Sequence, residues 1–157
     1  MGVEARILED KIDIGRVIEE MISEAYRRGG GALSIFIGFV KGRVEGHDVE
    51  ELVYEAYMPY AENILRKIVA EESVREGIID ARVYHRIGAI KAGEPTVYVL
   101  VTATNRKTAI ETTAKIIERI KHEIPIFKLE IRDDGEYWII GDGKRIKRTI
   151  KTKDNHC

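Results

Sequence analysis

The sequence predicts an α+β domain with a mixed, mostly antiparallel sheet and two to three helices. Two observations indicate this class: some predicted strands follow one another directly along the chain, and others alternate with helices. Strands joined by short turns pair in the antiparallel sense, whereas a helix between two strands allows a crossover into the same sheet. The chain has 157 residues, of which 44% are hydrophobic and 34% charged, so it can form one domain with its own core.

A short strand at residues 5–9 precedes the first predicted helix. Asp13 stands at the N-cap of this helix, where its carboxylate can accept a hydrogen bond from the first turn. The glycines at 29–31 end the helix. Its apolar residues recur at spacings of three and four, which places them on one buried face. They are Ile14, Val17, Ile18, Met21, Ile22 and Ala25.

Two strands and a second helix are predicted next. The nearly continuous apolar run at 32–40 is rich in branched and aromatic residues, which is typical of a strand buried on both faces. Residues 41–50 are predicted to be a polar loop, and the alternation at 52–57 predicts a strand. Pro59 opens the helix, at a position where its missing N–H costs nothing. The buried face of that helix is predicted to be Ile64, Leu65, Ile68 and Val69.

The third helix follows two further strands. Those strands are predicted at 81–86 and 96–103, with a turn between them. The helix spans 106–122, and Asn105 or Thr104 is placed to cap its N-terminus. Its core-facing residues are predicted to be Ile110, Ile116, Ile117 and Ile120.

The last predicted elements form a hairpin. Pro125 prevents the third helix from continuing, and the chain returns as a strand at 127–131. An Asp-Asp-Gly turn leads into a second strand at 137–140. No linker interrupts residues 1–140, which we expect to be a single domain. Residues 141–157 are rich in Lys and Arg and are expected to be a basic, flexible C-terminal tail.

The charge balance and the single cysteine exclude several classes of protein. The formal net charge is −1, so no overall field attracts nucleic acid or a membrane surface. Cys157 cannot form an internal disulfide, and the four histidines lack the spacing of metal ligands, so we expect no metal and no cofactor. The sequence has neither a signal-peptide core nor an apolar run of ~20 residues, and we expect a cytoplasmic protein.

Common enzyme motifs are absent, and the reaction stays open at this point. The segment GGGALS at 29–34 lacks the lysine of a phosphate-binding loop, and it precedes a strand instead of a helix. What remains is a set of cations at the ends of predicted elements. Each alone is compatible with a solvated surface charge, but together they fit a site for a phosphate or carboxylate. They are Lys41, Arg43, Arg86, Arg106, Lys107, Lys121 and Lys128.

Five segments resemble the large, catalytic subunits of molybdopterin synthase. They occur in the family's order and spacing from about residue 5 to residue 140. One such segment would be weak evidence of a relationship, but five in register are strong evidence. The segments are GALSIFIGFVKG (31–42), LVYEAYMPYAE (52–62), HRIG (85–88), TATNRKTAIE (102–111) and KHEIPIFKLE (121–130).

This resemblance implies an α/β-hammerhead-like fold and a homodimeric core that binds two small subunits, as a heterotetramer. Each small subunit would be a ubiquitin-like sulfur carrier, whose C-terminal Gly-Gly, activated as a thiocarboxylate, enters the large subunit's pocket. The implied substrate is cyclic pyranopterin monophosphate, and two successive sulfur transfers would form the molybdopterin dithiolene. The implied activity is that of a sulfurtransferase in molybdenum cofactor biosynthesis.

The resemblance also implies roles for individual side chains. Lys121 and Lys128 take the places of two active-site lysines, with Lys121 as the main catalytic lysine near the carrier's tail and Lys128 supporting it. Arg106 would hold the substrate phosphate. The full set expected to bind substrate is Lys41, Arg43, Asn105, Arg106, Lys121 and Lys128.

Two of these residues depart from the family's usual pattern and support an alternative function. Lys41 replaces a common Arg, which keeps the charge but loses bidentate hydrogen bonding. Asn105 replaces a common His and cannot transfer protons near pH 7. The alternative is a non-catalytic paralogue that binds a ubiquitin-like tail or an anionic ligand. A third hypothesis, nucleic-acid binding by the tail, lacks aromatic residues there on which bases could stack.

Overall fold

Two β-sheets and three α-helices make up the part of the chain that the computed structural model describes, residues 3–141 and 143–149. The helices are α1 (Ile14–Ala25), α2 (Tyr60–Ser73) and α3 (Arg106–Glu123), and a 3₁₀ turn, η1 (Tyr26–Arg28), follows α1. The strands are β1 (Glu4–Leu8), β2 (Ala32–Phe39), β3 (Arg43–Val44), β4 (His47–Ala56), β5 (Ile78–Arg86), β6 (Gly88–Lys91), β7 (Pro95–Ala103), β8 (Ile126–Arg132), β9 (Gly135–Ile140) and β10 (Lys144–Lys147).

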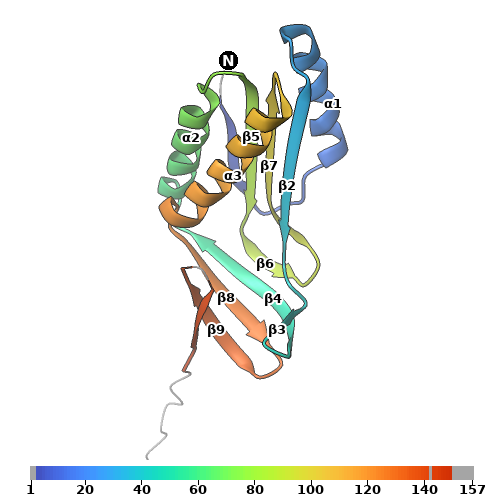
Figure 1. The fold of residues 1–157 in the computed structure, drawn as a ribbon. Helices are drawn as coiled ribbons and strands as arrows, with labels where there is room; N and C mark the ends of the chain where they lie inside the picture. The colour runs from blue at the N-terminus through green and yellow to red at the C-terminus, as the bar shows by residue number, and fades with distance from the viewer. Residues whose placement is uncertain (1–2, 142, 150–157) are drawn as a thin grey trace, which may run out of the picture.

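The first sheet is covered by helices on both faces. Its strand order is β1-β5-β7-β2, with β1 parallel to β5 and the other pairs antiparallel. Alternate residues of a strand point to opposite faces, and the core residues divide accordingly. Val83 and Val99 pack under α2 and α3, whereas Tyr84 and Leu100 pack under α1. The three layers are visible in the upper half of Figure 1.

The second sheet continues from the lower end of the first in Figure 1. Its order is β10-β9-β8-β4-β3, and β6 pairs with β4. The β4–β8 and β8–β9 pairs are antiparallel. Its own apolar cluster contains Val40, Val44, Val49, Leu52, Tyr54 and Ile90.

The structure confirms the predicted fold class and the two predicted side-chain caps. The Asp13 carboxylate accepts a hydrogen bond from the Arg16 N–H at 3.3 Å, and the Asn105 side chain accepts one from the Thr108 N–H at 2.9 Å. Both caps depend on residues adjacent in the chain, which is why the sequence alone is sufficient to predict them. No described helix is both long and apolar enough to cross a membrane.

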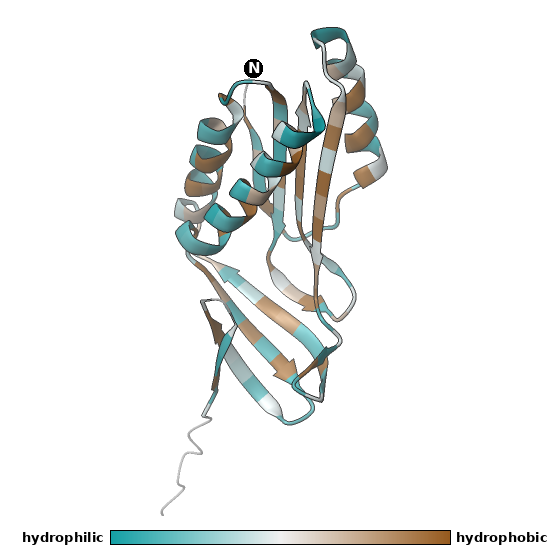
Figure 2. Cartoon of the chain, viewed as in Figure 1, coloured by the Kyte–Doolittle hydropathy of each residue, from teal (hydrophilic) through white to brown (hydrophobic). Residues whose placement is uncertain are grey.

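The prediction that the strand at 32–40 is buried on both faces is wrong. Strand β2 is an edge strand of the first sheet, and α1 packs over β5 and β7 instead. Ile35, Ile37 and Phe39 are therefore exposed, by 39%, 38% and 65%. The hydrophobic colour along β2 in Figure 2 marks this apolar strand. Ile110, predicted to face the core, is also exposed.

The polar loop and the basic tail contain strands that were not predicted. Strand β3 and the first half of β4 form a hairpin within residues 41–50. Residues 144–147 form β10 on β9, so the flexible tail expected from residue 141 does not describe this segment. Arg145 holds β10 in place through hydrogen bonds of 2.8 and 3.1 Å to the buried carboxylate of Glu130. The rest of the expected tail, from residue 150 through Cys157, lies outside the described residues.

Candidate active site

Lys128 lies partly buried over an aromatic ring in the second sheet. It stands on β8 directly opposite Tyr54 of β4, so both side chains project from the same face. The Lys128 Nζ is 5.6 Å from the centroid of the Tyr54 ring, within the range of a cation–π interaction. Burial, and then the positive charge of Lys121, lower the pKa of the Lys128 ammonium below its ordinary value. More of Lys128 is therefore neutral at a given pH than of a surface lysine.

His85 extends this arrangement into the interior. It occupies the end of β5, is 5% exposed, and meets the Tyr54 ring edge to face at 5.5 Å between centroids. Its Nδ1 lies 2.8 Å from the Arg86 carbonyl oxygen, which can only accept, so the proton is assigned to Nδ1. Burial lowers the pKa of His85 to about 4, the charge of Lys128 adds to this effect, and the bond to the carbonyl opposes it. His85 is therefore neutral near pH 7.

Lys121 reaches the same region from the last turn of α3. The helix ends at Glu123, Ile124 is buried, and Pro125 directs the chain into β8. This short connection brings the two lysines near enough for the charge of Lys121 to affect Lys128. Lys121 itself is exposed and open to a ligand.

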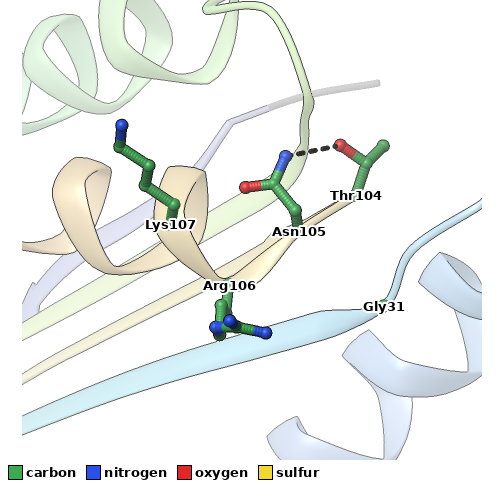
Figure 3. A pocket seen from close by; sticks show the side chains of 5 residues that line it. All are labelled: Gly31, Thr104, Asn105, Arg106 and Lys107. Carbon is green, nitrogen blue, oxygen red and sulfur yellow. Dashed lines mark hydrogen bonds between the residues drawn. The ribbon is translucent and has the colours of Figure 1, made fainter.

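A separate group of cations surrounds the N-terminus of α3. Gly31, Thr104, Asn105, Arg106 and Lys107 line a surface cavity of about 570 Å³ (Figure 3). The side chains of Arg106 and Lys107 point in different directions in this view. The Asn105 amide oxygen is used as the helix cap, and its Nδ2 donates to the Thr104 hydroxyl at 3.4 Å. Free N–H groups and cations at a helix N-terminus favour a phosphate or carboxylate.

Lys41 lies in the segment that joins β2 of the first sheet to β3 of the second, and Arg43 lies in the β3–β4 hairpin. Lys41 is exposed and follows β2 after one buried residue, Val40. The guanidinium of Arg43 donates to Asp48 Oδ1 at 3.2 Å and to the Gly46 carbonyl oxygen at 3.1 Å. Arg43 thus has partners within its own hairpin, whereas no hydrogen bond or ion pair within the described chain occupies Lys41.

Four of the six predicted site residues separate into two groups near opposite ends of α3, Asn105 and Arg106 in one group and Lys121 and Lys128 in the other. Arg106 begins the helix and Lys121 is in its last turn, fifteen residues along. At 1.5 Å per residue, their backbones are about 22 Å apart. A single chain therefore brings Lys121 and Lys128 together, but it holds Asn105 and Arg106 too far away for one small molecule to contact both groups.

Sequence comparison decides the family. The sequence model of the MoaE protein family matches residues 7–123, about three quarters of the chain. The chain belongs to the MoaE protein family. This match contains α1, α2 and all of α3, including both ends of the helix that carries the two groups of cations.

Curated relatives and solved structures of the family agree with this assignment. The molybdopterin synthase catalytic subunit of Pyrococcus abyssi is 40% identical over 125 residues, covering 80% of this chain and 84% of the relative. That of Bacillus subtilis is 40% identical over 121 residues, covering 77% of each. The crystal structure of molybdopterin synthase from Staphylococcus aureus superposes with a TM-score of 0.74 at 33% identity, over 84% of this chain and 93% of that one.

One described group of side chains has the residue types of a metal site. Ligand atoms of His47, Asp133 and Asp134 lie within 4.8 Å of one another. Each already has a protein partner: the imidazole Nδ1 of His47 is 2.8 Å from Asp133, and Asp134 accepts from Arg132 at 2.6 and 2.8 Å. The group is best explained as a salt-bridge network that closes the β3–β4 and β8–β9 turns.

Tyr54 and His85 lie next to the candidate site, and sequence reasoning did not single them out. Both lie within segments that resemble the family, but neither was assigned a role there. Tyr54 meets Lys128 across the β4–β8 pair, and His85 reaches Tyr54 from the first sheet. Contacts between strands so far apart in the chain leave no local signal. The available hint is that each lies in a segment that resembles the family, Tyr54 in residues 52–62 and His85 in residues 85–88.

Proposed function

We propose that this chain is the catalytic subunit of a molybdopterin synthase. It would transfer sulfur from the C-terminal thiocarboxylate of a ubiquitin-like small subunit to cyclic pyranopterin monophosphate, forming the molybdopterin dithiolene. The observation that carries the proposal is 40% identity to two molybdopterin synthase catalytic subunits over most of each chain. Lys121, in the last turn of α3, and Lys128, on β8, supply the proposed chemical centre.

Lys121 and Lys128 are suited to proton transfer during sulfur transfer. A lysine at its ordinary pKa of ~10.4 is a poor base near pH 7. Burial and the neighbouring charge lower the pKa of Lys128, which raises the neutral fraction able to accept a proton. Exposed Lys121 would meet the carrier's tail and the substrate first. In each transfer a carbon–sulfur bond on the pterin replaces a carbon–oxygen bond, whose oxygen leaves. Water then cleaves the bond between that sulfur and the carrier's carbonyl carbon, which leaves the carrier as a carboxylate.

The phosphate of the substrate would bind at the N-terminus of α3. Arg106 and the helix N–H groups supply positive charge there, and Asn105 supplies an amide. Since this end is about 22 Å from Lys121 in one chain, substrate can contact both groups only when a second copy provides one of them.

Strand β2 offers the surface for such a second copy. The outer edge of β1 is occupied, because Glu62 accepts from the Ile7 N–H at 2.9 Å and Arg66 donates to the Ala5 carbonyl at 3.3 Å. Among the described residues, β2 pairs only with β7, and its outer edge is open.

Antiparallel pairing of two β2 strands about a twofold axis would complete the site. Centred near Phe36, it would place Gly31 and the α3 N-terminus of one copy beside Lys41 of the other. The exposed Ile35, Ile37 and Phe39 would be covered at the same interface. This geometry supports the homodimeric core, to which two small subunits would add as a heterotetramer. Cytoplasm is the proposed compartment, because Cys157 has no second cysteine with which to form a disulfide.

Reconstitution tests the proposed reaction. The protein would be mixed with a thiocarboxylated carrier and cyclic pyranopterin monophosphate, and the dithiolene measured as its fluorescent oxidation product. We expect product only when both components are present. Carrier binding without product would instead favour the non-catalytic paralogue, the alternative that the Lys41 and Asn105 substitutions support.

Subunit mixing tests whether the site is shared between copies. Arg106→Ala and Lys121→Ala should each be inactive alone. Random mixed dimers would hold one intact site in half of the molecules, so the mixture should recover about a quarter of wild-type activity. No recovery in dimers shown to be mixed would place both groups in one chain's site and contradict the proposed pairing.

A further inference from the structure

Three side chains from three strands form one continuous stack, which begins at Lys128 and runs into the interior. Lys128 comes from β8, Tyr54 from β4 and His85 from β5, so the stack joins the second sheet to the first. The Lys128 ammonium is 5.6 Å from the Tyr54 ring centroid, and the His85 ring meets Tyr54 edge to face at 5.5 Å and 67°. Acid–base chemistry assigned to Lys121 and Lys128 leaves the two aromatic residues without a role.

The lower part of this stack is rigid. Tyr54 is 6% exposed and belongs to the apolar cluster of the second sheet. His85 is bonded through Nδ1 to the Arg86 carbonyl oxygen at 2.8 Å. Arg86 is itself fixed, because its guanidinium donates to the carbonyl oxygens of Glu9 at 3.0 Å and Pro95 at 2.8 Å.

Lys128, in contrast, has no hydrogen bond or ion pair to any described residue. Its ammonium lies over the face of the Tyr54 ring, 5.6 Å from the ring centroid. A ring face attracts a cation electrostatically, and an edge-to-face neighbour fixes the tilt of that ring. The position of the ammonium therefore depends on Tyr54, and the tilt of the Tyr54 ring depends on His85.

We propose that Tyr54 and His85 are positioning residues, which hold the Lys128 ammonium beside Lys121 by presenting a fixed aromatic face to it. This inference rests on the proposed sulfur-transfer function. The two residues do not contact the reacting atoms: they determine where the lysine stands. Losing the ring face should therefore lower kcat and leave KM nearly unchanged, because the substrate phosphate is bound by the α3 N-terminus of the second copy and Tyr54 does not contact it.

Fluorinated phenylalanines at position 54 separate electrostatics from packing. Tyr54→Phe keeps the ring face and should retain kcat within about twofold. Successive ring fluorination weakens the negative face at nearly constant size, and kcat should fall stepwise by about 3- to 30-fold in total, the range that cation–π energies allow. His85→Leu should lower kcat in the same direction. A flat kcat across the fluorinated series would overturn the proposal.

A matched control removes a different buried tyrosine. Tyr98 is 3% exposed and packs with Met21 and Leu100 beneath α1, away from the lysine pair. Tyr98→Leu and Tyr54→Leu both delete a buried ring, but only the second should lower kcat, by about tenfold or more. Equal losses of kcat in the two variants would mean that the Tyr54 effect is one of general stability, and would also overturn the proposal.

Lysine NMR gives a readout that does not need an active enzyme. After reductive ¹³C-methylation, which preserves the positive charge, the Lys128 signal is assigned by its absence from Lys128→Arg. Ring currents should displace it from the exposed lysines in the wild type and in Tyr54→Phe, and Tyr54→Leu should return it to them. A wild-type signal already among the exposed lysines overturns the stack. A displaced signal in an inactive wild type upholds the stack and contradicts the proposed function instead.

Discussion

Protonation of His85 should destabilise the fold by a measurable amount as the pH falls. The pKa of this residue is about 4 in the folded protein, against an ordinary value of 6.5, because the imidazole is buried. Between these two values the unfolded chain binds more protons than the folded one, so the free energy of unfolding must decrease as the pH decreases. The contribution of His85 is fully present above pH 6.5. The calculated loss between pH 7.5 and 4.5 is about 2.5 kcal/mol.

Urea unfolding at half-unit pH steps measures this loss. Carboxylates also titrate in the range, so the informative quantity is the difference between the wild type and His85→Gln, which has no imidazole. The free energy of the wild type should fall about 2.5 kcal/mol further than that of His85→Gln between pH 7.5 and 4.5. His122→Gln is the control, since His122 is exposed and should behave as the wild type does. Parallel curves for the wild type and His85→Gln would refute the assignment of His85 as a buried neutral residue.

Three further substitutions give distinct outcomes. Lys121→Ala should abolish dithiolene formation in the reconstituted assay while carrier affinity, measured by calorimetry, stays within about tenfold, because the lysine is required for chemistry more than for docking. Lys41→Arg should preserve or raise activity by restoring a guanidinium, and a lower kcat/KM would show that Lys41 is adapted to this chain. Arg145→Met should cost about 3 kcal/mol in urea unfolding, because it removes both hydrogen bonds to the buried Glu130 carboxylate and leaves only the longer ion pair to Arg132, at 3.7 Å. Exposed Arg148→Met should cost less than about 1 kcal/mol. Similar losses for the last two would show that Glu130 keeps adequate partners without Arg145.

The parts of the fold that were predicted correctly depend on short stretches of sequence. Asp13 and Asn105 cap helices through hydrogen bonds to residues three positions away. Pro125 ends α3 because its ring and missing N–H forbid another turn. Such signals are complete within a few residues, and they are sufficient to give the helices and the α+β class.

The parts that were missed depend on pairing between distant segments. The segment that forms β10 was predicted to be a flexible tail. Its basic composition does not show that Arg145 donates hydrogen bonds to the distant Glu130 carboxylate. The exposure of Phe39 follows from the position of β2 at the edge of its sheet, which an apolar run does not reveal. Tyr54 and His85 were missed for the same reason, because contacts among three strands that are distant in the chain produce no recognisable residue spacing.

The sequence proposes candidate site residues, but it does not give their arrangement. Family-like motifs indicated Lys121 and Lys128, and the turn at Pro125 brings these two together. The same motifs indicated Asn105 and Arg106, but only the length of α3 shows that these residues stand at its other end. Their contribution to one substrate site is therefore a question of assembly, which the sequence of a single chain does not answer.

The central claim is tested most directly by counting sulfur. With limiting thiocarboxylated carrier and excess cyclic pyranopterin monophosphate, mass spectrometry of the carrier and fluorescence of the oxidised product give both quantities in one reaction. A synthase that builds a dithiolene by two transfers should convert two carrier thiocarboxylates to carboxylates for each dithiolene formed, and none when the pterin is omitted. Carrier that stays thiocarboxylated, or that is hydrolysed without dithiolene, would contradict the assignment of this chain as the catalytic subunit.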